Sequence, residues 1–306
     1  MTIRIATRRS KLALAQSGWI KERLEALHPG LTVELREYVT RGDQIQNVPL
    51  SEVGGKGLFT KEIEDALLSG AADLAVHSLK DLPSELPAGL ALGAVPERED
   101  PRDALVLPPG AGAESLEQLP EGARVGSSSL RRMAQVLALR PDLRVESVRG
   151  NVDTRLRKLD EGQYDALILA SAGLRRLGLG HRISVALPPQ VCTPAPGQGA
   201  LGLELRANDE ATRAYVEALN DAAARARVSA ERALMDAVGG GCSIPLGAYA
   251  ELEEDRLELL AVLAAPDGTR LIRERGTGSA SDPIVLGREV AERLLAAGGR
   301  EVLERL

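Results

Sequence analysis

Aromatic residues are scarce in this chain of 306 residues: it has one Trp, one Phe and four Tyr. Proteins that bind single-stranded nucleic acid by stacking present aromatic faces to the bases, so we expect no such platform. No run approaches the ~18 apolar residues needed to cross a bilayer. The first residues also lack the apolar segment of a signal peptide, and we expect a cytoplasmic protein.

Cysteine and histidine are also scarce. The chain has two cysteines, Cys192 and Cys242, and three histidines. Two cysteines are too few for a disulfide framework; a single bridge between them stays open, although a reducing compartment disfavours it. The His and Cys residues do not form the closely spaced pairs of a structural zinc site, and we expect no metal.

Charge is unevenly distributed along the chain. The net charge is −6, yet residues 124–182 hold twelve Arg or Lys against six Asp or Glu. Because the remainder is strongly acidic, we do not expect a general nucleic-acid binder. A basic segment in an acidic protein suits a cleft that binds a small polyanion. On charge alone, a solvated arginine-rich helix face is the alternative.

Strands and helices are expected to alternate along the chain. The first series has strands at Ile3–Thr7, Thr32–Val39 and Leu74–His77, and helices at Thr60–Ser69 and Ser10–Leu27, the latter capped by Ser10. The second has strands at Arg124–Val125, Leu143–Val148 and Ala166–Ala170, and helices after Ser129 and at Val152–Leu159. The last has helices at Ala222–Val238 and Pro283–Ala297, and strands at Leu257–Leu263 and Arg270–Arg275.

This alternation predicts parallel βαβ units and therefore α/β domains. We expect one α/β domain in residues 1–99, a second in residues 105–193, and a small α+β domain in residues 222–306. Two α/β domains joined by more than one crossover suit the clamshell plan of periplasmic-binding-protein-like folds. Such proteins bind a ligand in the cleft between their domains and close around it by hinge motion.

Two glycine-rich segments imitate nucleotide-binding motifs. Residues 53–57 resemble a phosphate-binding loop, but Gly57 follows Lys56 where the motif needs Ser or Thr. Residues 197–202 have the spacing of a dinucleotide fingerprint, but they follow a proline-rich loop rather than a strand. We therefore expect no nucleotide site at either segment.

Arginine recurs at three successive turns that follow predicted strands. These turns contain Ser127, Ser128 and Ser129 with Arg131 and Arg132, then Arg149 with Arg155, then Arg175 and Arg176. Open α/β sheets bind ligands at the carboxyl ends of their strands, where amides, hydroxyls and guanidinium groups make anion sites. We expect a ligand with several carboxylates or phosphates; the serines alone would also serve as helix N-caps.

A carboxylate accompanies the cations of the first domain. Arg8 and Ser10 follow the first strand, and residues 77–83 follow another with Lys80 and Asp81. An acid beside an anion site suits a ligand that also carries an N–H or develops positive charge, for which Asp81 would act as general acid or base. The alternative is a loop aspartate that caps a turn or pairs with Lys80.

Cys242 follows three glycines, Gly239–Gly241. Glycine leaves room beside the thiol and permits backbone angles closed to other residues, so the loop suits a sulfur that is presented to a large group. Free cysteines are more often small buried hydrophobes. Local sequence alone leaves a buried, a reactive and a covalently modified thiol open.

Taken together, these motifs resemble the porphobilinogen deaminase (hydroxymethylbilane synthase) family. The likeness extends over nearly the whole chain and lies in residues 6–10, 53–59, 77–83, 98–103, 126–132, 149–152, 196–199 and 240–242, in family order. The resemblance implies a cytoplasmic three-domain transferase of tetrapyrrole and haem biosynthesis, whose first domain includes a return segment at about 200–217. The enzyme would join four porphobilinogen units head to tail, release ammonia, and yield linear hydroxymethylbilane.

The resemblance also implies roles for single residues. A dipyrromethane primer would be thioether-linked to Cys242, and Asp81 would be the catalytic carboxylate that holds pyrrole N–H groups. Acetate and propionate carboxylates would be bound by Arg8, Ser10, Lys80, Ser127, Ser128, Ser129, Arg131, Arg132, Arg149, Arg155 and Arg176. Lys56, Ser78 and Gln198 lie in the same motifs and are further candidates for binding. Glu52 departs from the lysine that relatives often have, and Ser127 from their threonine.

Two other functions remain as rivals. A clamshell binding protein for a small polyanion would account for the arginines but for neither Asp81 nor Cys242. A cysteine hydrolase needs a base beside the thiol, and no local motif places His28, His77 or His181 there. We therefore expect the transferase, as a monomer, with porphobilinogen as its substrate and no nucleic acid or membrane as partner.

Overall fold

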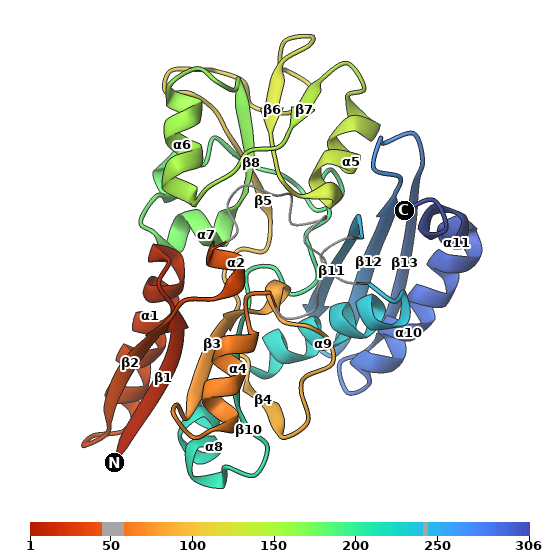
Figure 1. The fold of residues 1–306 in the computed structure, drawn as a ribbon. Helices are drawn as coiled ribbons and strands as arrows, with labels where there is room; N and C mark the ends of the chain where they lie inside the picture. Colours follow the sequence, from red (N-terminus) through yellow and green to blue (C-terminus); the bar gives the residue numbers. More distant parts are fainter. Residues whose placement is uncertain (45–57, 241–243) are drawn as a thin grey trace. The chain divides into compact units, whose positions relative to one another are not determined.

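The computed structural model describes residues 1–44, 58–240 and 244–306. The chain divides into two compact units, the first made of residues 1–99 and 200–225 and the second of residues 100–199 and 226–306 (Figure 1). The three-domain division with its boundaries stays a prediction. Within the described residues, no helix is both long and apolar enough to cross a membrane.

The first unit is built on a five-stranded sheet in the order β2-β1-β3-β10-β4. Its strands are β1 (Thr2–Arg8), β2 (Thr32–Tyr38), β3 (Leu74–Ser78), β4 (Leu90–Ala94) and β10 (Leu201–Arg206). Its helices are α1 (Lys11–Leu27), α2 (Arg41–Gln44), α4 (Lys61–Leu68), the 3-10 turn η1 (Leu79–Asp81), α8 (Glu210–Val216) and the 3-10 turn η3 (Glu217–Leu219).

Alternate strand residues of this sheet point to opposite faces. Ile5 and Val76 belong to the hydrophobic cluster that includes Ile20 and Leu24 of α1. Ala6 and Ala75 belong to the cluster that includes Ile63 and Leu67 of α4. The two helices therefore cover opposite faces of the sheet. A side chain near the end of a strand points toward one helix or the other.

The second unit contains two sheets. One has the order β7-β6-β8-β5-β9 and is formed by β5 (Asp103–Val106), β6 (Arg124–Gly126), β7 (Arg144–Glu146), β8 (Ala166–Ala170) and β9 (Val185–Ala186). The other has the order β11-β12-β13 and is formed by β11 (Leu246–Glu253), β12 (Arg256–Ala264) and β13 (Leu271–Ser279). The helices are α5 (Leu130–Leu139), α6 (Val152–Asp160), α7 (Ser171–Arg176), the 3-10 turn η2 (Gly180–Arg182), α9 (Ala222–Ala237, which starts in the first unit), α10 (Pro283–Leu294), the π-turn η4 (Leu295–Gly299) and α11 (Arg300–Leu303).

The expected elements largely form, and Ser10 caps α1 as predicted. Its side chain accepts a hydrogen bond from the Ala13 amide at 3.2 Å. Strand β8 has the predicted bounds, Ala166–Ala170. The final helix, predicted to run to Ala297, instead ends at Leu294 and continues as a π-turn, in which Gly298 has φ 112°.

The predicted parallel βαβ units form in both five-stranded sheets, but each sheet also contains antiparallel strands that the alternation did not predict. β1 runs parallel to β2 and β3, but β10 runs antiparallel to β3 and β4. In the second unit β5 is antiparallel to β8 and β9. β10 begins where β3 ends, with Leu201 opposite Ser78, so the returning chain can only run in the opposite direction.

One glycine of the second unit is required by close packing. A Cβ on Gly287 of α10 would lie 2.4 Å from the carbonyl oxygen of Ala230 in α9. Both helices contribute to the cluster that fills one face of the three-stranded sheet, through residues such as Leu234, Leu259 and Val290. The missing side chain lets α10 approach α9 at backbone distance.

Candidate functional site

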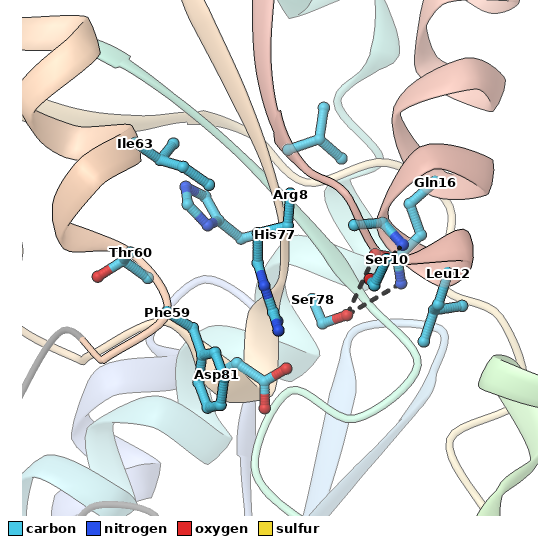
Figure 2. Close-up of a pocket in the computed structure, with 12 residues that line it drawn as sticks. Arg8, Ser10, Leu12, Gln16, Phe59, Thr60, Ile63, His77, Ser78 and Asp81 are labelled. Carbon is cyan, nitrogen blue, oxygen red and sulfur yellow. Dashed lines mark hydrogen bonds between the residues drawn. The ribbon is translucent and has the colours of Figure 1, made fainter. Parts of the chain in front are cut away.

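A pocket of the first unit lies where β1 and β3 end. The two strands are parallel, so their carboxyl ends meet at one edge of the sheet, as expected for a ligand site in an α/β fold. Figure 2 shows the side chains that line it: Arg8, Ser10, Leu12, Ala13, Gln16, Phe59, Thr60, Ile63, Val76, His77, Ser78 and Asp81. The structure thus brings together four residues that the sequence singled out: Arg8, Ser10, Ser78 and Asp81.

Asp81 and Arg8 provide the charges of this pocket. Asp81 closes the 3-10 turn after β3 and is exposed, whereas Arg8 at the end of β1 is half-buried. The Arg8 guanidinium carbon lies 4.2 Å from the centroid of the Phe59 ring, a cation–π contact. In Figure 2 the Arg8 side chain extends toward the Asp81 carboxylate. The pocket can therefore offer an acceptor to an N–H group and a cation to an anion.

The two serines of the pocket are held by local hydrogen bonds. The Ser10 hydroxyl is engaged as the N-cap of α1. The Ser78 hydroxyl accepts a hydrogen bond from the Gln16 amide nitrogen at 2.9 Å (Figure 2). Lys80 lies between Leu79 and Asp81 in the 3-10 turn and is half-buried. Gln16, Phe59 and His77 were missed as pocket residues. Folding brings Gln16 of α1 and Phe59, which precedes α4, to the strand ends, whereas His77 belongs to β3 itself and lies in the motif at residues 77–83.

The predicted serine turn of the second unit lies between β6 and α5. Ser127 is buried, and its hydroxyl accepts a hydrogen bond from the Ser129 amide at 3.3 Å. The hydroxyl of Ser128 donates to the carbonyl oxygen of Val148, next to Arg149. The turn after β6 is thus tied to the turn after β7.

Arg131 and Arg132 lie in a buried network around Asp103, which is fully buried. Arg131 Nη1 donates to Asp103 Oδ2 at 2.6 Å and to the Thr193 carbonyl at 2.6 Å. Arg132 Nε donates to Asp103 Oδ1 at 2.9 Å. The sequence motif predicted that both arginines bind an external carboxylate. In the structure each binds a carboxylate of the protein itself. Their contact with a ligand stays a prediction.

Asp103 remains ionised in this network. Burial alone would raise the pKa of its carboxyl, but Arg131 and Arg132 outweigh that effect and hold the pKa well below its usual range. Arg131 Nε is buried and has no hydrogen-bond partner among the residues described here. Gln198, 1% exposed, donates to Asp103 Oδ1 at 2.8 Å and to the Pro101 carbonyl at 2.7 Å, so it helps to hold the network.

Arg149, Arg155 and Arg176 are half-buried residues of the following turns. Burial, with the like charges of Arg132 and Arg149, lowers the pKa of Arg155 to about 10. The side chain of Arg155 donates to the Gly150 carbonyl at 2.8 Å. Arg176 donates to the Gly199 carbonyl at 2.7 Å. Because the positive charges of Arg132 and Arg149 repel that of Arg155, an anion bound among these three arginines would be stabilised.

The turn that carries Arg149 depends on a glycine. Gly150 has φ +108°, in the left-handed region, and a Cβ there would lie 2.7 Å from the Thr154 methyl carbon. The next residue, Asn151, is the N-cap of α6. Amides at such a helix start favour negative charge, which adds to the effect of the arginines.

Two predicted site residues, Lys56 and Cys242, lie outside the described residues. Among the described residues, no group of three or more His, Cys, Asp or Glu side chains could hold a metal ion. Cys192 is fully buried, and burial together with Asp103 raises the pKa of its thiol to about 12. We therefore expect Cys192 to be unreactive in the folded protein.

The chain matches two models of known protein families. A model described as "Porphobilinogen deaminase, dipyromethane cofactor binding domain" matches residues 3–214. A second, "Porphobilinogen deaminase, C-terminal domain", matches residues 225–296. The chain belongs to the porphobilinogen deaminase family. As a member of it, the chain is a transferase of tetrapyrrole biosynthesis with the family's dipyrromethane cofactor-binding domain.

Individual relatives cover nearly the full length. The porphobilinogen deaminase of Roseiflexus sp. (strain RS-1) is 54% identical, over 99% of this chain and 98% of its own. That of Brevibacillus brevis is 51% identical, over 98% and 96%. Solved structures with a similar backbone include the BvgS VFT2 domain of Bordetella pertussis, with a TM-score of 0.42 at 17% identity over 72% of this chain and 85% of that one. The sulphonate-binding protein SsuA of Escherichia coli has a TM-score of 0.41 at 16% identity over 77% and 70%.

Proposed function

We propose that this chain joins four porphobilinogen units head to tail, releases ammonia at each addition, and yields linear hydroxymethylbilane. Membership of the porphobilinogen deaminase family supports this activity. The observation in the structure that best supports it is the pocket in which the exposed Asp81 carboxylate accompanies Arg8. A pyrrole that carries carboxylates, an N–H and an aminomethyl group needs a cation for its carboxylates and a hydrogen-bond acceptor for its N–H.

Asp81 is assigned the chemical role. Its carboxylate would accept hydrogen bonds from pyrrole N–H groups and stabilise the positive charge that develops as ammonia leaves. The exposed Asp81 carboxylate lies at the end of a short turn, where a substrate can reach it. Arg8, Lys80, Ser10 and Ser78 would orient the acetate and propionate groups of the substrate.

The second unit fits a dipyrromethane primer on the chemistry of its donors. Each pyrrole ring of this cofactor carries two carboxylates, and in the cluster of Arg132, Arg149 and Arg155 burial and then like charge lower the pKa of Arg155. Carboxylates placed there would relieve that repulsion. Arg131, Arg176 and the turn of Ser127 to Ser129 are assigned to the same task. When bound, the cofactor supplies the carbon to which the first substrate unit is added.

Attachment of the primer to Cys242 is tested by intact mass. The purified holoenzyme should exceed the sequence mass by two pyrrole units, and Cys242→Ser should lose this excess. Cys192→Ser is the matched control. Because Cys192 is buried, this variant should keep the excess mass. An active enzyme without the excess would refute the covalent primer, and a protein that only binds porphobilinogen would favour the clamshell binding protein.

The role of Asp81 is tested by lengthening its side chain. Asp81→Glu keeps the charge but moves the carboxylate, and we expect a folded, primer-bearing protein whose kcat is about 100-fold lower. Turnover of Asp81→Glu within a factor of two of the parent would refute the assignment of Asp81.

Arg149→Ala should impair chain growth more than thermal stability, because Arg149 is half-buried at the surface.

Location, assembly and domain division belong to the same proposal. We assign the protein to the cytoplasm, as a monomer with three domains at residues 1–99 with 200–217, 105–193 and 222–306. Size-exclusion chromatography with light scattering measures the assembly, and a dimer would contradict it. Limited proteolysis should cleave between the assigned domains before it cleaves within them.

A further inference from the structure

A buried group of ionisable side chains adjoins the Asp81 pocket. His77 Nε2 lies 2.9 Å from Glu204 Oε2, and the two side chains are 5% and 0% exposed. Glu64, a third ionisable residue of this region, is 7% exposed. His77 also lines the pocket. We name His77, Glu204 and Glu64 the His77 cluster; the proposed function assigns it no role.

Sheet register brings the cluster together from distant parts of the chain. β3 and β10 are antiparallel, with His77 opposite Gly202 and Ala75 opposite Glu204. His77 and Glu204 are therefore diagonal neighbours on one face. This is the face covered by α4, because Ala75 belongs to the same hydrophobic cluster as Ile63 and Leu67. Glu64 comes from α4 itself.

The last two residues of β3 are anchored on opposite faces of the sheet. His77 points toward α4, and in Figure 2 its ring is turned toward Ile63, away from the Asp81 carboxylate. The next residue, Ser78, points the other way and binds Gln16 of α1 in both directions, at 2.9 and 3.3 Å. Asp81 follows three residues later. The exit of the chain from β3 is thus fixed on both sides immediately before the proposed catalytic carboxylate.

Ionisable groups are a costly way to build such an anchor. Burying charge or unpaired polar atoms destabilises a fold unless each finds a partner. Glu204 Oε1 is buried, and no described residue hydrogen-bonds to it. Burial raises the pKa of Glu64, and the nearby Glu204 raises it further. Apolar pairs of similar volume often replace buried ion pairs without loss of stability, so stability alone does not account for the His77–Glu204 pair.

We propose that His77 is a positioning residue for turnover: its hydrogen bond to Glu204 fixes the end of β3 and thereby the place of Asp81 in the pocket. This inference rests on the proposed function, since it assumes that Asp81 acts on the substrate. Facing His77 are Glu204 from β10 and Glu64 from α4; Arg8 from β1 and Asp81 from η1 line the same pocket. His77 itself is not assigned a proton transfer.

The test separates positioning from folding and from binding. His77→Leu removes the hydrogen bond, and we expect kcat to fall about 10- to 100-fold while KM changes by less than about threefold, since small displacements of a catalytic group cost that much. His77→Gln can still donate to Glu204 and should recover kcat to within about threefold of the parent. Glu204→Leu should reproduce the loss.

A matched control comes from the same unit. His28 Nε2 is hydrogen-bonded to the Tyr215 carbonyl at 3.0 Å and is absent from the residues that line the pocket. His28→Leu should leave kcat unchanged. If His77→Leu fails to fold, His77→Gln and Glu204→Leu decide the question by the same measurement. Parental kcat in His77→Leu or Glu204→Leu would overturn the inference, as would a loss in His77→Gln equal to that in His77→Leu.

The readouts also distinguish this inference from the proposed function. Each variant is assayed as holoenzyme, with the primer confirmed by intact mass and turnover followed by ammonia release. If the parent lacks the primer or releases no ammonia from porphobilinogen, the proposed function is wrong. If the parent behaves as proposed and the ratios among variants fail, only the role of His77 is wrong.

Discussion

Asp103→Asn is the most informative change in the second unit. The Asp103 side chain is fully buried and accepts hydrogen bonds from Arg131 at 2.6 Å, Arg132 at 2.9 Å and Gln198 at 2.8 Å. Asparagine has nearly the same shape but no charge, and its amide NH2 group would face guanidinium donors. Within the part of the chain that the structure describes, Asp103 is the one carboxylate that forms ion pairs with Arg131 and Arg132, and both buried arginines would lose it.

The expected loss of stability is large. Breaking a buried ion pair by removing one partner costs about 3–5 kcal/mol, because the remaining charge is left uncompensated. For a unit of this size, about 2–4 °C of melting temperature corresponds to each kcal/mol, so we expect Tm to fall by about 6–20 °C. Because Arg131 and Arg132 outweigh burial and depress the pKa of Asp103, the parent should keep this stabilisation at pH 5–8 and lose it only as pH falls below about 4.

Calorimetry and urea unfolding at pH 7 measure the effect. Asp165→Asn is the matched control, because Asp165 pairs with Arg124 at 3.0 Å in the same unit but both side chains are about 40% exposed. Exposed pairs contribute about 0–1 kcal/mol. If Asp103→Asn lost no more stability than Asp165→Asn, the reasoning about the buried network would be refuted.

Three further predictions follow from other buried groups. Cys192 should resist iodoacetamide at pH 8 in the folded protein and react after unfolding, because burial raises the pKa of its thiol to about 12; rapid labelling of the native protein, measured by peptide mass, would contradict this. Glu64→Gln should gain stability over the parent as pH rises from about 5 to 8, since burial raises the pKa of Glu64 and the parent loses stability as that proton leaves; a difference in Tm that does not change with pH would count against it. Gly287→Ala should cost about 1–3 kcal/mol by overpacking, because its Cβ would lie 2.4 Å from the Ala230 carbonyl oxygen; unchanged urea unfolding would show that the helices can separate.

Local sequence was a good guide to single elements. The Ser10 cap was predicted from a serine before an amphipathic run and is confirmed. Strand β8 was predicted with its observed bounds from a short apolar run. Such features depend on interactions within a few residues, which are visible in the sequence. The family, and with it the transferase activity, followed from motifs whose order survives in the linear chain.

Only the tertiary structure decided which of these residues meet. Asp103 and Arg131 are 28 positions apart, and His77 and Glu204 are 127 apart, so neither pair has a local signature. The second contact depends on strand register: Glu204 of β10 lies opposite Ala75 of β3, and this register places it on the face that carries His77. The sequence alone determined the kinds of groups available, a carboxylate at Asp81 and arginines after three strands. Folding decided that Arg131 and Arg132 bind a carboxylate of the protein itself, because burying two charges requires a partner within the same dry space.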